Sequence, residues 1–121
     1  MKARVAIVGG GVMGVRTAWA CARRMRASDG TVVLFERREL AAGSSGRSGA
    51  VLRQHYSSPI VAAMARDSLA EYSTLEARTG RAIGFQGCGV LTIAGPRRPE
   101  LIQRVRSNVA MQQRLGITTR I

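Results

Sequence analysis

The sequence reads VAIVGGGVMG from Val5 to Gly14, a short apolar run joined directly to a glycine-rich turn. Four consecutive apolar residues ahead of glycines are typical of a strand that is buried on both faces. The glycines follow the spacing Gly-x-Gly-x-x-Gly, at Gly9, Gly11 and Gly14. The first glycine permits a tight turn, the second lets a pyrophosphate approach the backbone, and the third lets a helix pack closely on the sheet.

A strand–helix–strand unit is expected around this turn. The spacing of apolar residues predicts a helix over residues 12–26, and Ser28-Asp29-Gly30 ends it with turn chemistry. Residues 31–35 form a second β-rich run. Two parallel strands joined in this way have a right-handed crossover. The apolar residues that support the helix are Val15, Ala18, Trp19 and Ala22.

Glu36 stands 22 positions after Gly14, where dinucleotide-binding units carry an acidic residue. A carboxylate there accepts hydrogen bonds from the adenosine ribose hydroxyls and repels a 2′-phosphate, which disfavours NADP. The amides of Val12 and Met13 open the helix and offer its positive dipole end to the phosphates. A surface glutamate at a strand end is the alternative interpretation. The fingerprint by itself leaves both FAD and NAD open.

The sequence after residue 56 predicts two further helices. Ser58 as N-cap and Pro59 at the first helical position begin a helix that continues to about residue 79 and stops at Gly80. A last helix is expected from Pro99 to Gly116. The positions expected to face inward are Val61, Met64, Tyr72 and Leu75 in the first of these helices and Leu101, Val105 and Val109 in the second.

Short strands are also expected in this part of the chain. Residues 83–85 and 90–93 are apolar and β-rich, and they flank Gln86-Gly87. Residues 117–121 have the composition of the approach to another strand. These segments predict the first strands of a second, antiparallel layer.

Composition argues against several classes of protein. Basic residues number 19 against 7 acidic ones, a net charge of +12, but the arginines are scattered and aromatic residues make up 4%. A nucleic-acid partner is not expected, because stacking aromatics are scarce. Cys21 and Cys88 are too far apart for a metal or redox motif, and we expect no metal site. We expect no signal peptide, no membrane span and a cytoplasmic location.

Residues 36–56, ERRELAAGSSGRSGAVLRQHY, help to choose the cofactor. This stretch resembles the second FAD-binding segment of the D-amino-acid oxidase superfamily, and within it the sarcosine oxidases and the sarcosine oxidase β subunit. The likeness covers essentially the whole chain. The motifs that carry it are IVGGGVMG (7–14), LFER (34–37), AGSSGRSG (42–49), AVLRQHY (50–56) and GFQGCGVLTIAG (84–95).

The resemblance implies FAD as cofactor and a role for each matching residue. The three glycines of the fingerprint surround the FAD pyrophosphate, and Glu36 holds the adenosine ribose. An arginine fork suits phosphate oxygens, and a loop of small residues lets an extended ligand lie against backbone. An ordinary solvated loop is the alternative for these residues. The further cofactor contacts that the resemblance implies are Arg37 near the adenine, Ser44 and Ser45 at the pyrophosphate or ribityl chain, and Arg47 and Ser48 close by.

Arg53 is the candidate for substrate binding. An arginine at the matching place in sarcosine oxidase-like proteins binds the substrate carboxylate, and a bidentate guanidinium fixes the orientation of an amino acid. A solvated arginine ahead of a helix is the alternative. Ala50 departs from the family pattern, since monomeric sarcosine oxidases carry a basic residue there, which favours a dehydrogenase over an oxidase. His55, the only histidine, is a candidate general base or a hydrogen-bonding residue.

We therefore expect an α/β fold in two parts. Residues 1–82 are expected to be the N-terminal part of a Rossmann-type FAD-binding domain with a parallel sheet, and residues 83–121 the start of an antiparallel substrate domain. In the resembled family, later sequence completes the flavin pocket. We therefore interpret the chain as the N-terminal part of a longer enzyme, inactive alone, that depends on a C-terminal half or a partner subunit.

The expected activity is oxidation of the C–N bond of an amino acid or N-methylated amine, by hydride transfer to flavin. Two alternatives remain open at the level of sequence. An NAD-dependent dehydrogenase fragment would bind nicotinamide without flavin absorbance. A non-catalytic FAD-binding module or subunit would need a partner chain for any activity.

Overall fold

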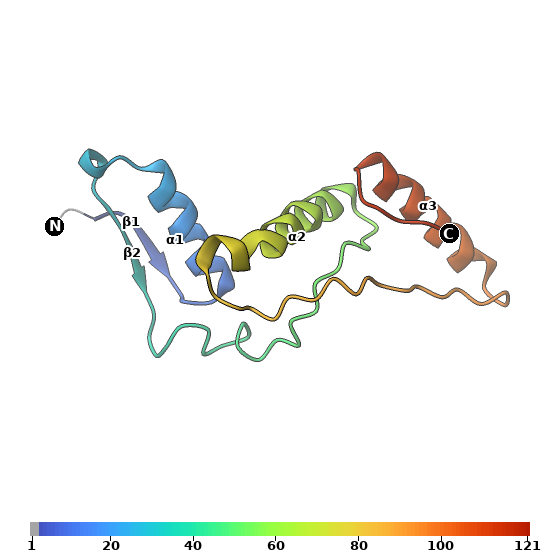
Figure 1. Ribbon diagram of the computed structural model, residues 1–121, viewed down its shortest axis with the longest axis horizontal. Helices are drawn as coiled ribbons and strands as arrows, with labels where there is room; N and C mark the ends of the chain where they lie inside the picture. Colours follow the sequence, from blue (N-terminus) through green and yellow to red (C-terminus); the bar gives the residue numbers. More distant parts are fainter. Residues whose placement is uncertain (1–2) are drawn as a thin grey trace. The chain divides into compact units, whose positions relative to one another are not determined.

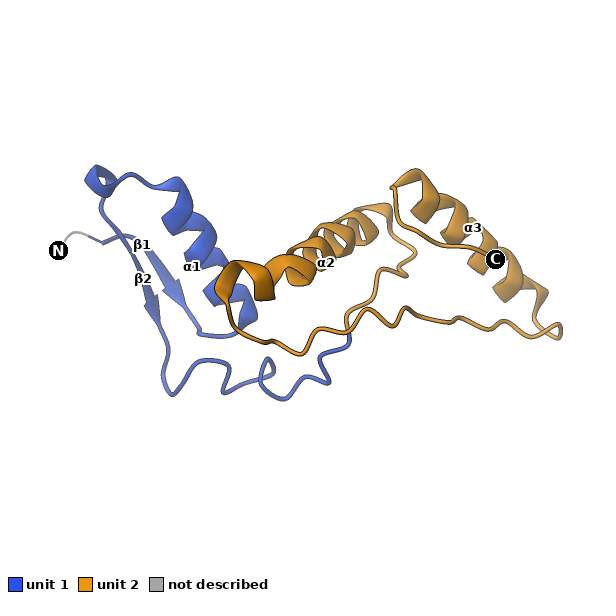
Figure 2. Ribbon diagram, viewed as in Figure 1, with its two compact units in different colours: residues 1–51 blue, residues 52–121 orange. Residues whose placement is uncertain are grey.

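The computed structural model describes residues 3–121 and divides the chain into two compact units, residues 1–51 and residues 52–121 (Figure 2). The first unit contains the strands and the glycine-rich turn, and the second contains two long helices (Figure 1). The boundary expected between residues 82 and 83 concerns the domains of a complete enzyme and stays a prediction.

The first unit is the expected strand–helix–strand. Strand β1 covers Ala3–Val8, helix α1 covers Val12–Arg24, and strand β2 covers Thr31–Phe35. The strands pair in parallel, with Ile7 opposite Leu34 and Val8 opposite Phe35. A 3₁₀ helix, η1, at Ala27–Asp29 makes the turn between α1 and β2. The α/β class and the parallel crossover are thus confirmed.

Strand β1 is covered on one face only, which corrects the expectation of burial on both. Val5 and Ile7 are half-buried, whereas Ala6 is exposed and Val8 is 88% exposed. Helix α1 packs against the face that carries Ile7, and no described element of the first unit covers the other. The four apolar residues therefore alternate between a packed and an open face.

Helix α1 presents more of its apolar side chains to solvent than its periodicity suggests. It ends at Arg24 rather than Arg26. Ala18 is half-buried, but Val15 and Ala22 are exposed. Trp19 lies between two guanidinium groups, with the Cζ atoms of Arg16 and Arg23 at 4.1 and 4.8 Å from its ring centroid. These cations contact the face of the indole.

Helix α2 covers Pro59–Thr79 and agrees with the expected limits. Pro59 occupies the first turn, and Gly80 ends the helix in the left-handed conformation with φ +66°. The Gly80 amide donates to the carbonyl of Glu76 at 2.8 Å, which satisfies one of the last carbonyls of the helix. Ser58 is the N-cap residue, but its side chain makes no capping hydrogen bond.

The core of the second unit is small and lies where helix α3, Pro99–Arg114, meets α2. Ala62 of α2 is fully buried against Met111 and Ile117, and Tyr56 packs on this cluster. Val109 is buried, as expected. The α2 face was predicted only in part, because Val61 and Met64 are exposed while Tyr72 and Leu75 are half-buried. Leu101 and Val105 of α3 are half-buried as well.

The strands expected at 83–85 and 90–93 do not form, and residues 117–121 are not a strand either. The amides of Ile83 and Gly84 donate instead to the Glu76 carboxylate, at 2.6 and 2.9 Å. Gly84 and Gly89 take positive φ values, which interrupt an extended run. At residues 83 and 84, the amides are therefore bonded to a side chain rather than to a neighbouring strand.

The left-handed end of α2 gives a test of stability. Changing Gly80 to alanine places a Cβ in a conformation that costs about 1–2 kcal/mol for an L-residue, and we expect a loss of that size in the free energy of unfolding. Urea unfolding followed by circular dichroism measures it. The matched control is Gly87→Ala, since Gly87 has open space around it and no positive φ. Equal effects of the two changes would contradict the assignment of Gly80 as the cap.

Candidate cofactor-binding site

The glycine-rich turn leaves the carboxyl end of β1 and enters α1 within three residues. Gly9 has φ +107°, a conformation that favours glycine, and its amide donates to the Phe35 carbonyl at 2.8 Å. Gly11 is the N-cap residue of α1 and has an extended conformation. The first-turn amides of Val12 and Met13 therefore point out of the helix with no acceptor inside it.

Gly14 is required by close packing. A Cβ at this position would overlap the carbonyl oxygen of Gly9, and it would also contact Ile7 Cγ2 at 3.6 Å. The first turn of α1 consequently lies directly against the end of β1. This is the close approach that the third glycine of the fingerprint predicts.

Gly10 was not singled out by the sequence pattern, yet it is the buried residue of the turn. A Cβ on Gly10 would lie 2.8 Å from Leu40 Cδ2 and 3.0 Å from the Cβ and Cγ atoms of Glu36. Position 10 is a free position in Gly-x-Gly-x-x-Gly, so the fingerprint carries no signal for it. Its requirement for glycine comes from the side chains that pack over it.

Glu36 lies at the glycine turn. Its Oε2 accepts a hydrogen bond from the Gly10 amide at 2.7 Å, and its Oε1 accepts one from the Arg38 amide at 3.0 Å. The amides of Arg38 and then of Gly10 lower the pKa of this carboxyl below its ordinary value of 4.5, so it is ionised at neutral pH. A carboxylate has about four acceptor positions, so these amides leave acceptor capacity for a ribose hydroxyl.

Ser45 connects the small-residue loop to the start of α1. Its Oγ accepts a hydrogen bond from the Val12 amide at 2.9 Å, across 33 residues of sequence. The loop is also held by the Ala41 amide, which donates to the Gly10 carbonyl at 2.9 Å. A Cβ added to Gly11 would come 3.0 Å from Ser45 Oγ, so the second glycine leaves room for this contact.

The other predicted cofactor contacts belong to the same unit but bond within their own segment. Arg37 and Arg47 are exposed. The Ser44 carbonyl accepts the Arg47 amide at 3.2 Å, and Ser48 Oγ accepts the Ala50 amide at 3.1 Å. The structure therefore joins Glu36 and Ser45 to the glycine turn by hydrogen bonds. The roles of Arg37, Ser44, Arg47 and Ser48 stay predictions.

Arg53 and His55 belong to the second unit. The Arg53 guanidinium lies over the ring of Tyr56, with Cζ 5.2 Å from the centroid. His55 Nδ1 is 3.2 Å from Nε2 of Gln112, a buried residue of α3. Sequence reasoning leaves the role of Tyr56 ambiguous and does not select Gln112, because a glutamine on a helix carries no motif. The catalytic roles of Arg53 and His55 stay predictions.

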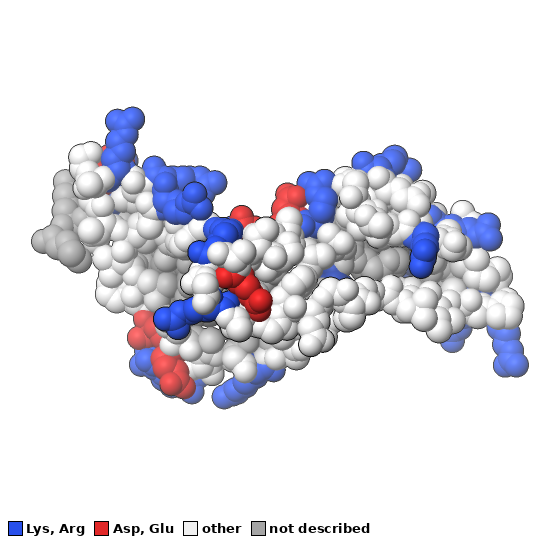
Figure 3. All heavy atoms as spheres, in the orientation of Figure 1, with Lys and Arg blue, Asp and Glu red and all other residues white. Residues whose placement is uncertain are grey.

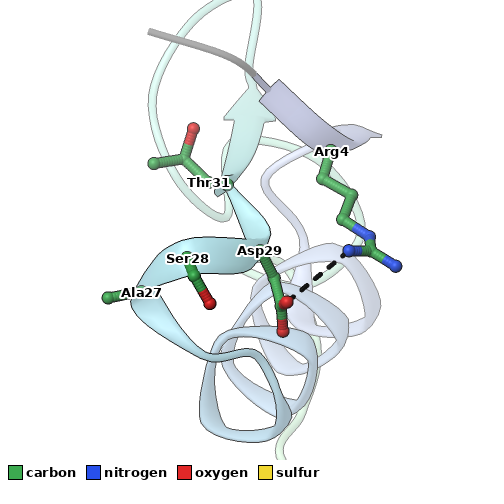
Figure 4. Close-up of a pocket in the computed structure, with 6 residues that line it drawn as sticks. Arg4, Ala27, Ser28, Asp29 and Thr31 are labelled. Atoms are coloured by element: carbon green, nitrogen blue, oxygen red, sulfur yellow. Dashed lines mark ion pairs between the residues drawn. The ribbon is translucent and has the colours of Figure 1, made fainter.

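A pocket of the first unit lies at the end of the sheet opposite to the glycine turn. It is lined by residues at the amino ends of β1 and β2, where Arg4 pairs with Asp29 at 3.7 Å (Figure 4). Ligands of open parallel sheets bind outside the carboxyl ends of the strands. We therefore place the candidate site at the glycine turn and not in this pocket.

On the side of the molecule that Figure 3 shows, arginine side chains are dispersed over both units, with acidic groups between several of them. Arg66 pairs with Asp67 at 2.7 Å and Arg78 with Glu71 at 2.9 Å, and exposed pairs of this kind contribute under about 1 kcal/mol each. Within residues 3–121, no helix has the length and apolar character needed to cross a membrane.

These features define a dinucleotide-binding unit of Rossmann type: a parallel strand pair, a glycine turn at a helix start, and a carboxylate bonded to that turn. Residues 4–121 match the model of the DAO family, described as FAD dependent oxidoreductase. The chain belongs to this family. FAD is thus the cofactor of the family, and the NAD-dependent alternative is set aside.

The chain is also similar to curated relatives. It is 32% identical over 93 residues to the mitochondrial dimethylglycine dehydrogenases of Rattus norvegicus, Homo sapiens and Mus musculus. The match covers 77% of this chain and 10% of each relative, so the chain spans about a tenth of their length. No solved structure matches significantly.

The lowered pKa of Glu36 predicts a pH dependence. A carboxyl whose pKa falls on folding stabilises the protein above its unfolded pKa, and this contribution is lost as the pH falls from about 4.5 through the lower folded value. We expect the urea midpoint of the wild type to drop in that window, and Glu36→Gln to remove this part of the drop. Fluorescence of Trp19, the only tryptophan, reports the first unit.

The matched control for this titration is Glu39→Gln, because Glu39 is an exposed carboxylate of the same segment. It should follow the wild type at every pH. If Glu36→Gln also follows the wild type, the two amides do not stabilise the ionised carboxylate.

Proposed function

We propose that the glycine turn and Glu36 hold the ADP half of FAD. The observation that carries this proposal is the 2.7 Å hydrogen bond from the Gly10 amide to the Glu36 carboxylate. It supports a single site where phosphates meet the first-turn amides of α1 and ribose hydroxyls meet the remaining acceptor positions of Glu36. Arg37, Ser44, Arg47 and Ser48 are proposed to complete the contacts along the nucleotide.

The residues present fit this cofactor. Gly14 keeps the helix start close to β1, and Gly11 leaves the space beside Ser45 open. Ser45 Oγ accepts from the Val12 amide and still has its own proton to donate to a phosphate oxygen. The ionised Glu36 suits ribose hydroxyls and opposes a 2′-phosphate.

We further propose that the protein oxidises the C–N bond of an amino acid or N-methylated amine. Family membership and the similarity to proteins named dimethylglycine dehydrogenase support this class of substrate. Bound FAD supplies the hydride acceptor, and the residues of this chain supply binding and orientation. The absence of a basic side chain at Ala50 supports a dehydrogenase. A cytoplasmic location and a partner subunit or further domain remain predictions.

Arg53 is the proposed substrate anchor. Its guanidinium is exposed and can form two parallel hydrogen bonds with a carboxylate. Its position over the Tyr56 ring restricts the side chain before substrate arrives, which lowers the entropic cost of binding. A carboxylate held in this way fixes the orientation of the adjacent amine.

Gly14→Ala tests the cofactor site. The added Cβ overlaps the Gly9 carbonyl, so the helix start must move away, and we expect FAD affinity to fall about tenfold or more as charge-assisted contacts to its amides are lost. Titration of flavin fluorescence measures the change. Gly87→Ala is the control, since nothing lies within 4 Å of that position and it lies outside the proposed nucleotide-binding segments. Unchanged FAD affinity in Gly14→Ala would argue against this site.

Arg53→Met tests the substrate anchor in the FAD-loaded enzyme that includes the proposed C-terminal half or partner subunit. We expect the concentration of dimethylglycine that half-reduces the flavin without oxygen to rise about tenfold to a hundredfold, because a charged hydrogen-bonded pair is lost. Bleaching of flavin absorbance measures it. Arg97→Met, an exposed arginine elsewhere in the second unit, should change nothing. No bleaching by any amino acid or N-methylated amine in the wild type would overturn the proposed activity.

A further inference from the structure

Gln112 is the buried polar residue among the described residues, with 2% of its surface exposed. It lies on α3 beside Met111, a member of the small core of the second unit. An amide buried without hydrogen bonds is costly, so the partners of this side chain determine whether its burial is tolerated. Those partners come from a segment more than 50 residues away in sequence.

The two contacts of Gln112 fix the direction of each hydrogen bond. Its Nε2 is 3.5 Å from the Tyr56 carbonyl oxygen and 3.2 Å from His55 Nδ1. A carbonyl oxygen only accepts, so the side-chain nitrogen, and not the oxygen, must face this segment. One N–H is then directed to the carbonyl and the other to His55. With Nε2 of Gln112 donating, Nδ1 is the acceptor, and this orientation would put the proton of the neutral imidazole on Nε2.

The segment of residues 53–56 also makes a second set of contacts. The Tyr56 ring packs on the core formed by Ala62, Met111 and Ile117, and the Arg53 guanidinium lies over that ring. Helix α3 thus contacts the segment at its backbone through Gln112 and at its ring through Met111. Residues 53–56 contain both substrate-site candidates of the chain.

We propose that Gln112 is a positioning residue that holds His55 as the Nε2–H tautomer and fixes the segment carrying Arg53. The link to substrate through Arg53 rests on the proposed function, while the tautomer does not. In this arrangement the lone pair of His55 is engaged by Gln112, and the other ring nitrogen is a donor. His55 then serves as a hydrogen-bond donor and not as the general base.

Nitrogen-15 NMR of the imidazole tests this directly. His55 is the only histidine of the chain, so its two ring nitrogens are assigned without ambiguity. In the neutral ring at alkaline pH, two-bond correlation spectra should show Nδ1 unprotonated and Nε2 protonated. A protonated Nδ1, or rapid exchange between the two tautomers, in the wild-type chain overturns the proposal without any variant.

Variants separate positioning from general stability. Gln112→Leu removes both donors while keeping a side chain of similar size, and we expect the single tautomer to be replaced by a mixture. Gln113→Leu is the matched control, because Gln113 is exposed and its side chain donates to Thr119 instead. A single Nε2–H tautomer retained in folded Gln112→Leu overturns the proposal.

A second variant covers failure of Gln112→Leu to fold, judged by circular dichroism. Gln112→Glu presents acceptors to His55, and we expect the imidazole proton to move to Nδ1. An unchanged tautomer in this variant would contradict the proposal that residue 112 sets the tautomer of His55. These spectra need neither FAD nor substrate. Lack of flavin reduction in the enzyme completed by its C-terminal half or partner subunit, together with the expected tautomer, contradicts only the proposed activity. An active enzyme with the wrong tautomer contradicts only the role of Gln112.

Discussion

The hydrogen bond between the Gly10 amide and the Glu36 carboxylate ties the turn after β1 to the end of β2, across 26 residues of sequence. A glycine at residue 10 favours it, because a Cβ there would press against the side chains of Glu36 and Leu40. The carboxylate stays ionised because backbone amides surround it. The ionised carboxylate of Glu36, the glycine turn and the end of β2 are therefore held together, and the candidate FAD site depends on this arrangement.

The loop after β2 extends this structure to the helix. Ser45 accepts the Val12 amide, so an N-terminus without a capping side chain of its own is capped by a residue 33 positions later. The hydroxyl keeps its proton and can still donate to a phosphate. A loop of small residues thus does more than give space to a ligand: it positions a polar group at the helix start.

The second unit depends on a different kind of contact. Its core is small, and the polar side chain of Gln112 is buried within it because two acceptors from residues 55 and 56 satisfy its amide. Helix α3 therefore orders the segment that precedes α2. Arg53, over the Tyr56 ring, is restrained by the same packing.

The sequence by itself determined the features that local chemistry controls. The spacing of Gly9, Gly11 and Gly14 predicts a tight turn and a closely packed helix. The composition of Thr31–Phe35 predicts a parallel partner strand, and Gly80 marks the end of α2. Glu36 lies next to the glycine turn, as its position after β2 predicts, because the spacing of a strand–helix–strand unit is nearly fixed; its contact with ribose stays a prediction. Only the tertiary structure decided the need for glycine at position 10, the capping by Ser45 and the burial of Gln112, because each depends on side chains distant in sequence. The strand expected at 83–85 does not form for the same reason: a strand needs a hydrogen-bonded neighbour, and the amides of Ile83 and Gly84 donate to the Glu76 carboxylate instead. The strand expected at 90–93 is absent as well.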